Sequence, residues 1–213
     1  MARKTKEEAL KTREAILDAA VQVFSVQGVA KTGLADIASA AGVTRGAIYW
    51  HFRNKDDLLG ALWEQILLPF EPLNRISENP DAPDPLGTLR RAHLAFFQSL
   101  KQDPRRLQLL QILLNKCEAV EDAGPQYSHR VSHLVEGRQK TEIILRYAVR
   151  QGQLPDTLDV RLGSLAIISF ISGLINNLIL LPEFIDLDRE IPALLDGLIQ
   201  MLRAGFSRSG EEG

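Results

Sequence analysis

Apolar residues recur at every third or fourth position along most of this chain, which is the spacing of amphipathic helices. The first such stripe lies in residues 7–27, where Ile16, Leu17 and Phe24 share a face, and Gly28 ends the helix. Farther along, the same spacing predicts helices over residues 86–101, 104–118, 126–151, 158–181 and 188–204. We find no alternating strand pattern and no internal repeat, so the predicted fold class is all-α.

Between residues 32 and 52 the pattern predicts two short helices joined by a tight turn. The first helix has four small or apolar residues on one face: Leu34, Ile37, Ala38 and Ala41. Gly42 falls where this helix must stop, because glycine adopts the left-handed conformation without steric cost. Thr44 is placed to cap the second helix with its hydroxyl. The sequence therefore predicts a helix-turn-helix.

The second helix of this motif has the residues expected of a DNA-reading helix. A helix-turn-helix places the N-terminal residues of its second helix against base edges in the major groove. Arg45, Gly46, Tyr49 and Trp50 face away from the first helix, and Arg45 is placed to read a guanine through two hydrogen bonds. Contacts to phosphates, which fix register without reading sequence, are predicted for Thr44, Tyr49, His51 and Lys55.

A further helix follows the motif and leads into the rest of the chain. Asn54 is a good cap for it, and Pro69 and Pro72 are predicted to kink it. The prolines of residues 79–85 then mark a loop and the clearest boundary of the chain. We therefore expect a helix-turn-helix DNA-binding domain over residues 1–54, a second helical domain over 55–206, and a flexible tail over 207–213.

Composition and charge describe an ordinary globular protein. Of its 213 residues 45% are hydrophobic and 24% charged, and the formal net charge of −2 argues against indiscriminate binding to polyanions. Residues 1–60 hold nine Lys and Arg against seven Asp and Glu, a weak basic excess that suits DNA binding by two copies. A single cysteine and the lack of a secretory signal favour the cytoplasm.

Residues 5–60 resemble the DNA-binding domain of the TetR family of bacterial repressors. The matching residues are Thr12, Arg13, Ile16, Leu17, Ala19, Ala20, Phe24, Gly28, Thr32, Ile37, Ala38, Ala41, Gly42, Val43, Tyr49, His51, Phe52, Lys55 and Leu58. Residues 1–8 and 42–52 also resemble the AcrR-like subgroup, which represses multidrug efflux-pump operons. Segments 115–118, 172–175 and 180–182 are similar to the same subgroup.

This resemblance implies a ligand-responsive repressor that small apolar or aromatic compounds release from operator DNA. It implies an all-helical homodimer whose three N-terminal helices bind DNA. Residues 55–206 would then be a ligand-binding and dimerisation domain, whose helices enclose a ligand and whose last two helices form the dimer interface. The DNA contacts that it implies are Thr32, Thr44, Arg45, Tyr49, His51 and Lys55.

Residues 162–181 form an uncharged segment long enough to cross a bilayer. Asn176, Asn177 and three serines make a membrane span costly. The favoured reading is a helix with one face toward a ligand pocket and the other toward a second copy. Pocket candidates are Phe97, Leu110, Leu113, Leu114, Cys117, Ile168 and Ile171, with polar Ser172 and Asn176; without the resemblance, solid core is the better interpretation.

Two further groups of residues could carry chemistry, but each is better explained without it. His129 and His133 have the spacing of zinc ligands, with Glu136 as a third, but an exposed polar face is the better reading. Cys117 is either a redox-active thiol beside Lys116 or a small buried residue. No catalytic motif is found, and we expect no cofactor or metal.

Two alternatives to an efflux-pump repressor stay open. One is a regulator, either repressor or activator, of a metabolic or stress operon. The other is an enzyme or ligand carrier that retains the helix-turn-helix.

Overall fold

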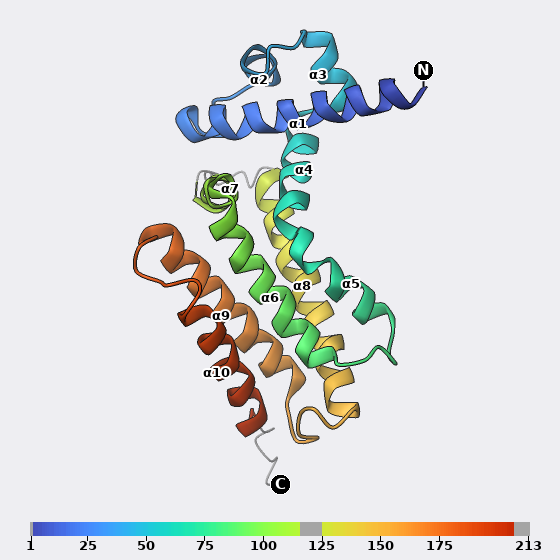
Figure 1. Ribbon diagram of the computed structural model, residues 1–213, viewed down its shortest axis with the longest axis vertical. Helices are drawn as coiled ribbons and strands as arrows, with labels where there is room; N and C mark the ends of the chain where they lie inside the picture. The colour runs from blue at the N-terminus through green and yellow to red at the C-terminus, as the bar shows by residue number, and fades with distance from the viewer. Residues whose placement is uncertain (1, 116–124, 207–213) are drawn as a thin grey trace. The chain divides into compact units, whose positions relative to one another are not determined.

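The computed structural model describes residues 2–115 and 125–206, so Cys117 and the predicted tail 207–213 lie outside the described residues. The described chain is almost entirely helical and has no β-strand element (Figure 1). Its helices are α1 (Ala2–Gln27), α2 (Leu34–Ala40), α3 (Arg45–His51), α4 (Lys55–Leu67), a 3₁₀ turn η1 (Leu68–Phe70), α5 (Glu71–Glu78), α6 (Pro85–Gln102), α7 (Pro104–Asn115), α8 (Pro125–Arg150), α9 (Val160–Leu180) and α10 (Glu190–Ala204). The predicted all-α class is confirmed.

The chain packs as two compact units. Unit 1 contains Met1–Leu67 and Pro104–Val131, and unit 2 contains Leu68–Asp103 and Ser132–Gly213. Unit 1 combines α1–α4 with α7, because α1 and α4 both pack against α7. These packing units differ from the functional division at residue 54 expected from the sequence, and that division stays a prediction.

The helix-turn-helix of unit 1 forms as the sequence predicts. Ile16, Leu17 and Phe24 of α1 are fully buried, and α2 packs against both α1 and α3. Gly42 has a φ of +65°, and the turn closes with a hydrogen bond of 3.0 Å from the Val43 N–H to the Ala38 carbonyl. The Thr44 hydroxyl accepts a hydrogen bond of 3.1 Å from the Ala47 N–H, which caps α3.

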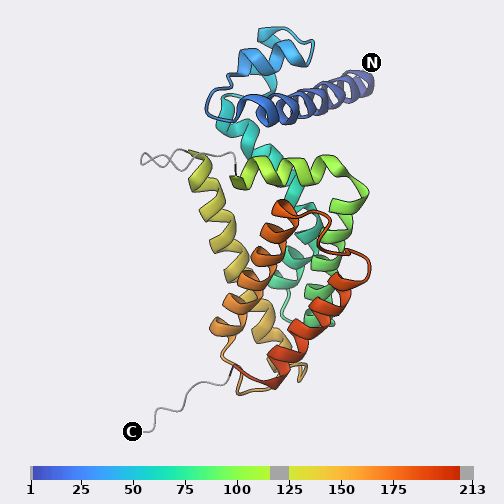
Figure 2. The same ribbon diagram turned by 90° about the vertical axis from the view of Figure 1, so that its left-hand side faces the viewer.

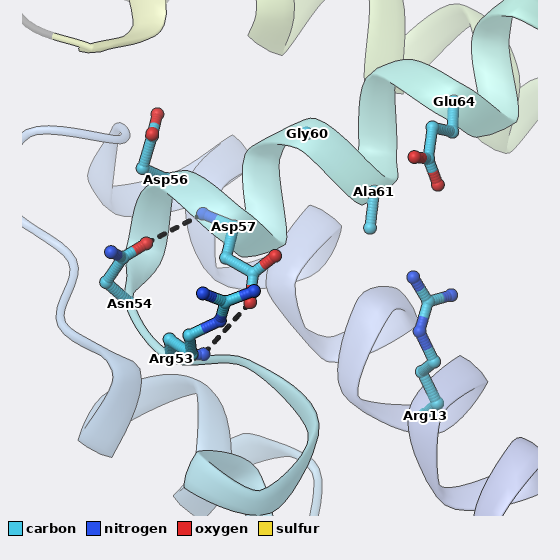
Figure 3. Close-up of a pocket in the computed structure, with 8 residues that line it drawn as sticks. All are labelled: Arg13, Arg53, Asn54, Asp56, Asp57, Gly60, Ala61 and Glu64. Carbon is cyan, nitrogen blue, oxygen red and sulfur yellow. Dashed lines mark hydrogen bonds between the residues drawn. The ribbon is translucent and has the colours of Figure 1, made fainter.

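The start of α4 is fixed by a reciprocal pair of side-chain caps (Figure 3). The Asn54 Oδ1 accepts a hydrogen bond of 2.8 Å from the Asp57 N–H, and the Asp57 carboxylate accepts one of 3.0 Å from the Arg53 N–H. This exchange is similar to a capping box, except that the Asp57 carboxylate bonds the N–H of Arg53, which precedes the cap residue Asn54. The N-terminal turn of α4 is therefore well defined, as the predicted Asn54 cap requires.

The two prolines after α4 do more than kink a helix. The helix ends at Leu67, a 3₁₀ turn carries Pro69, and Pro72 lies in the first turn of the separate helix α5. Proline lacks the N–H that a continuing helix needs but is tolerated in a first helical turn. The separate helix α5 and the 3₁₀ turn were not predicted.

Unit 2 is organised around α6. Phe96 and Phe97 are buried, and the Phe70 ring of η1 stacks on Phe96 with ring centroids 5.1 Å apart. The loop over residues 79–84 lies inside this unit, where its Ala82 carbonyl accepts a hydrogen bond of 3.0 Å from the Gln151 side chain. Asp84 caps α6 by accepting a hydrogen bond of 3.0 Å from the Gly87 N–H.

The last two helices of unit 2 lie side by side (Figures 1 and 2). Each buries one face in the unit and exposes the other. Alone among the described helices, α9 is long and apolar enough to cross a membrane, a weak criterion that core helices also meet. From Leu162 onward its exposed side is uncharged and contains Leu165, Ser169, Ser172 and Asn176; Arg161, in the first turn, is exposed as well.

Candidate nucleic-acid interface

Four residues of α3 form an exposed surface, which we call the α3 outer face: Arg45, Gly46, Tyr49 and Trp50. Ile48 on the opposite side is fully buried, which fixes the rotation of the helix in unit 1. Trp50 is 73% exposed and Tyr49 47% exposed. Aromatic side chains this exposed on a well-packed helix indicate a binding surface.

The side chains of the α3 outer face are partly ordered by one another. The guanidinium carbon of Arg45 lies 5.9 Å from the centroid of the Tyr49 ring, within the range of a cation–π contact. The Trp50 ring meets the His51 ring edge-on at 4.6 Å between centroids. Arg45 therefore extends along the outer face with its fork of N–H donors available to a partner.

His51 lies at the edge of this face and is half-buried. Burial and the positive charge of Arg13 lower the pKa of the His51 imidazole below its ordinary value. Both causes favour the neutral ring, which can donate one hydrogen bond to a phosphate without adding a charge.

Two predicted DNA contacts are engaged within the chain. The Thr32 side chain is 2% exposed, and its hydroxyl donates a hydrogen bond of 2.7 Å to the Gly28 carbonyl. The Lys55 ammonium donates to three backbone carbonyls of the segment between α1 and α2. A phosphate contact by either side chain requires it to give up a bond that it makes here.

A polar cleft of about 400 Å³ lies beside the start of α4 in unit 1 (Figure 3). Its lining residues are Arg13, Arg53, Asn54, Asp56, Asp57, Gly60, Ala61 and Glu64. Three carboxylates and two guanidinium groups belong to this lining, a charge balance that does not suit a phosphate. This cleft was not predicted from the sequence, because its walls come from α1 and α4, about 50 residues apart.

The predicted ligand-binding residues are divided between the two units. In unit 1, Leu110 and Leu113 of α7 are buried and Leu114 is half-buried. In unit 2, Phe97 and Ile171 are buried and Ile168 is half-buried, whereas Ser172 and Asn176 lie on the exposed side of α9. An enclosed ligand is lined by side chains that face inward. The structure thus does not place Ser172 and Asn176 where an enclosed site would use them, and Cys117 lies outside the described residues.

The alternative zinc site is not assembled by the residues that the structure describes. Glu136 accepts a hydrogen bond of 2.9 Å from the Ser132 hydroxyl, and the His129 side chain lies outside the description. No group of three potential metal ligands occurs among the described residues.

Comparison with known proteins identifies the class that the fold and the α3 outer face define. Residues 16–62 match the model of bacterial regulatory proteins of the tetR family. Residues 84–204 match the C-terminal region of MAATS-type transcriptional repressors. The chain therefore belongs to the TetR family of helix-turn-helix transcription regulators, and the predicted resemblance is confirmed.

Individual relatives match over nearly the whole chain. The HTH-type transcriptional regulator TtgR of Pseudomonas putida is 42% identical over 203 residues, which cover 95% of this chain and 97% of TtgR. The crystal structure of NalD from Pseudomonas aeruginosa is 32% identical with a TM-score of 0.75, covering 96% of this chain and 100% of that one. The SmeT–triclosan complex is 31% identical with a TM-score of 0.81, covering 94% and 93%. These relatives are regulators, and the enzyme alternative finds no support among them.

Proposed function

We propose that this chain is a homodimeric, cytoplasmic repressor of a multidrug efflux-pump operon, released from its operator by small apolar or aromatic compounds. NalD is described as a secondary repressor of the MexAB-OprM multidrug efflux pump, and SmeT as the repressor of the SmeDEF pump of Stenotrophomonas maltophilia. The observation that carries the proposal is the α3 outer face, where Arg45 is exposed beside two exposed aromatic rings.

In this proposal the α3 outer face enters the major groove. Arg45 reads a guanine through two hydrogen bonds, while Tyr49 and Trp50 contact the groove wall and its bases. Thr44 and His51 hold phosphates on either side. Thr32 and Lys55, also predicted as contacts, are not part of this face, and their side chains bond to backbone carbonyls of residues 28–32.

The homodimer is proposed to form through α9 and α10. The exposed side of α9 includes Leu162 at 37%, Leu165 at 46% and Leu180 at 64% exposure. On α10, Leu194 is 36% exposed and Met201 40% exposed. A face of this composition, free of charge along α9 from Leu162 onward, favours burial against its own copy. Ser172 and Asn176 then belong to this seam, where they hydrogen-bond across it.

The ligand is proposed to bind against apolar side chains of α7 that the sequence predicts for its pocket: Leu110, Leu113 and Leu114. Phe97, Ile168 and Ile171, which belong to unit 2, stay pocket predictions from the sequence. Helix α7 contacts the DNA-binding helices within unit 1. Arg105 pairs with Asp18 of α1 at 2.5 Å, and Arg106 donates a hydrogen bond of 2.7 Å to the Gln65 carbonyl of α4. A ligand that shifts α7 therefore also shifts α1 and α4.

A DNA-binding assay with a named probe compound tests this proposal. The full chain is titrated into a labelled duplex taken from directly upstream of its own gene, and into a scrambled duplex, with and without triclosan. We expect a Kd of about 10⁻⁸ M or tighter for the upstream duplex. Triclosan should weaken it by about fivefold or more, and sucrose should not. Equal affinity for both duplexes would contradict the repressor, and an unchanged Kd with triclosan would contradict the proposed ligand class.

A further inference from the structure

Lys55 occupies the first position of α4 and reaches back to a segment more than 20 residues away in sequence. This segment, residues 28–33, connects α1 to α2, and we call it the α1–α2 connection. The Lys55 Nζ lies 2.7 Å from the Val29 carbonyl oxygen, 3.0 Å from that of Thr32 and 3.3 Å from that of Ala30.

These contacts use the full donor capacity of the side chain. A lysine ammonium has three N–H donors and no acceptor, and three carbonyl oxygens surround it here. No ion pair among the described residues includes Lys55, so the carbonyls are what compensates its charge there. Burial lowers the pKa of this ammonium, which agrees with a group withdrawn from solvent.

The connection that Lys55 holds leads directly to the start of α2. Gly28 has a φ of +78°, and its carbonyl accepts the Thr32 hydroxyl. The Gly33 N–H donates a hydrogen bond of 2.8 Å to Asp36 in the first turn of α2. The place where α2 begins is therefore set by the connection, and α2 in turn packs against α3.

The start of α4, where Lys55 lies, also has a defined geometry. Lys55 follows Arg53 and Asn54, whose cap with Asp57 fixes the first turn of α4 (Figure 3). The Lys55 side chain thus joins two segments of defined geometry, the start of α4 and the turn that precedes α2.

We propose that Lys55 is a positioning residue, which pins the α1–α2 connection to the start of α4 and so sets the placement of the helix-turn-helix for DNA. The inference rests on the proposed DNA binding. It differs from the phosphate contact expected from the sequence, because the ammonium is directed at backbone carbonyls and acts through α2 and α3.

The substitution Lys55→Arg distinguishes the positioning role of Lys55 from a phosphate contact. Arginine keeps the positive charge and serves a phosphate at least as well. Its planar guanidinium cannot direct three donors to three carbonyls that converge on one point. Lys55→Met removes both the charge and the contacts. Lys31→Met is the matched charge control, because Lys31 is an exposed cation in the same connection.

The measurement is the Kd at several salt concentrations, for the duplex enriched by in vitro selection with the wild-type chain and for a random duplex. We expect Lys55→Arg and Lys55→Met each to weaken the selected duplex by roughly tenfold or more, as for loss of charge-assisted hydrogen bonds. That loss should exceed the loss for Lys31→Met. The random duplex should be affected less, and the salt slope should stay as in the wild type.

Amide hydrogen exchange supplies an independent readout in the absence of DNA. In both Lys55 variants, exchange should accelerate in residues 28–40 and stay unchanged in α9 and α10. Wild-type affinity in Lys55→Arg would overturn the inference. So would a salt slope reduced by about 0.9 in Lys55→Met with equal losses on both duplexes, which identifies a phosphate contact. If the wild-type chain enriches no duplex at all, the proposed function itself fails.

Discussion

Arg45 combines exposure with a defined direction, which is what base readout requires. Its neighbour Gly46 leaves space at the N-terminal end of α3, and the Tyr49 ring supports the guanidinium at 5.9 Å. A bidentate arginine–guanine pair contributes about 1–3 kcal/mol of discrimination against a wrong base.

Arg45→Ala should therefore weaken operator binding by about 1–3 kcal/mol while leaving the affinity for random DNA nearly unchanged. Arg45→Lys is the matched control, because lysine keeps the charge without the fork of donors. The Arg45→Lys variant should bind random DNA as the wild type does and should recover operator binding only in part. Equal losses on operator and random duplexes would remove Arg45 from base readout.

His93 is the buried titratable group of unit 2. Its Nδ1–H donates a hydrogen bond of 2.8 Å to the Leu89 carbonyl, which can only accept, and its ring packs edge-on against Phe70. Burial lowers the pKa of His93 below 6.5, although the bond to Leu89 acts in the opposite direction. The unfolded chain thus binds a proton more readily than the folded chain.

The free energy of unfolding should consequently fall as the pH drops below about 6.5, with a slope contribution of up to about 1.4 kcal/mol per pH unit from His93. The contribution of His93 to the free energy of unfolding should be complete above about pH 6.5. Urea unfolding between about pH 7.5 and 5.5 measures the slope, and His93→Gln should flatten it. Identical slopes in the two proteins would contradict the assignment.

At the scale of single residues, the sequence predicts those roles that depend on partners close by in the chain. Gly42 and Thr44 are read correctly because their partners lie within five residues. The bonds of Lys55 to residues 29–32 are not visible in the sequence, because they join positions 23 to 26 residues apart. The exposure of Ser172 and Asn176 depends on how α9 is rotated in unit 2, and helical spacing alone does not fix that rotation.

Among the elements, α6 depends on a single cap at its start. Asp84 has a φ of +49° and accepts hydrogen bonds from the Gly87 N–H and from the side chains of Gln153 and Arg91. Burial acts to raise the pKa of Asp84, but these bonds outweigh it and lower the pKa. A β-carbon at position 87 would collide with the Asp84 carboxylate.

Gly87→Ala should therefore destabilise the chain by about 1–2 kcal/mol through loss of the cap. The same substitution at Gly137 of α8, where a β-carbon meets no atom within 4 Å, should stabilise it by up to about 1 kcal/mol. Chemical denaturation of both variants measures the difference. A stabilised Gly87→Ala variant would show that the Asp84 cap contributes little.

Helix positions were predicted closely where apolar spacing is regular. The helices expected over residues 86–101 and 158–181 occur as Pro85–Gln102 and Val160–Leu180. Helix α5 was missed because Pro69 lies just before it and Pro72 lies in its first turn, and a proline between apolar residues is compatible with either a kink or a break. In the structure the chain breaks there, and the separate helix α5 packs against α6.

For the whole molecule, the proposed dimer seam has a small residue near its centre. Gly173 is exposed on the same side of α9 as Ser169 and Asn176, and a β-carbon there meets no atom within 4 Å of the single chain. A larger side chain is thus tolerated by the isolated fold but would separate two copies packed along α9.

Gly173→Gln should keep the helical content of the wild type and dissociate the dimer, as measured by analytical ultracentrifugation. Gly137→Gln places the same side chain at an exposed position of α8 and is the control for helix effects. It should remain dimeric. A dimeric Gly173→Gln variant would exclude this part of α9 from the seam.

The central claim is that two copies of this chain present their α3 outer faces to one DNA duplex. In vitro selection of duplexes bound by the full chain, followed by the binding stoichiometry of the enriched sequence, tests it most directly. The account predicts an inverted repeat with half-sites about 34–36 Å apart, or a multiple of that distance, bound by an even number of chains. A single half-site bound by one chain, or no enriched sequence, would contradict it.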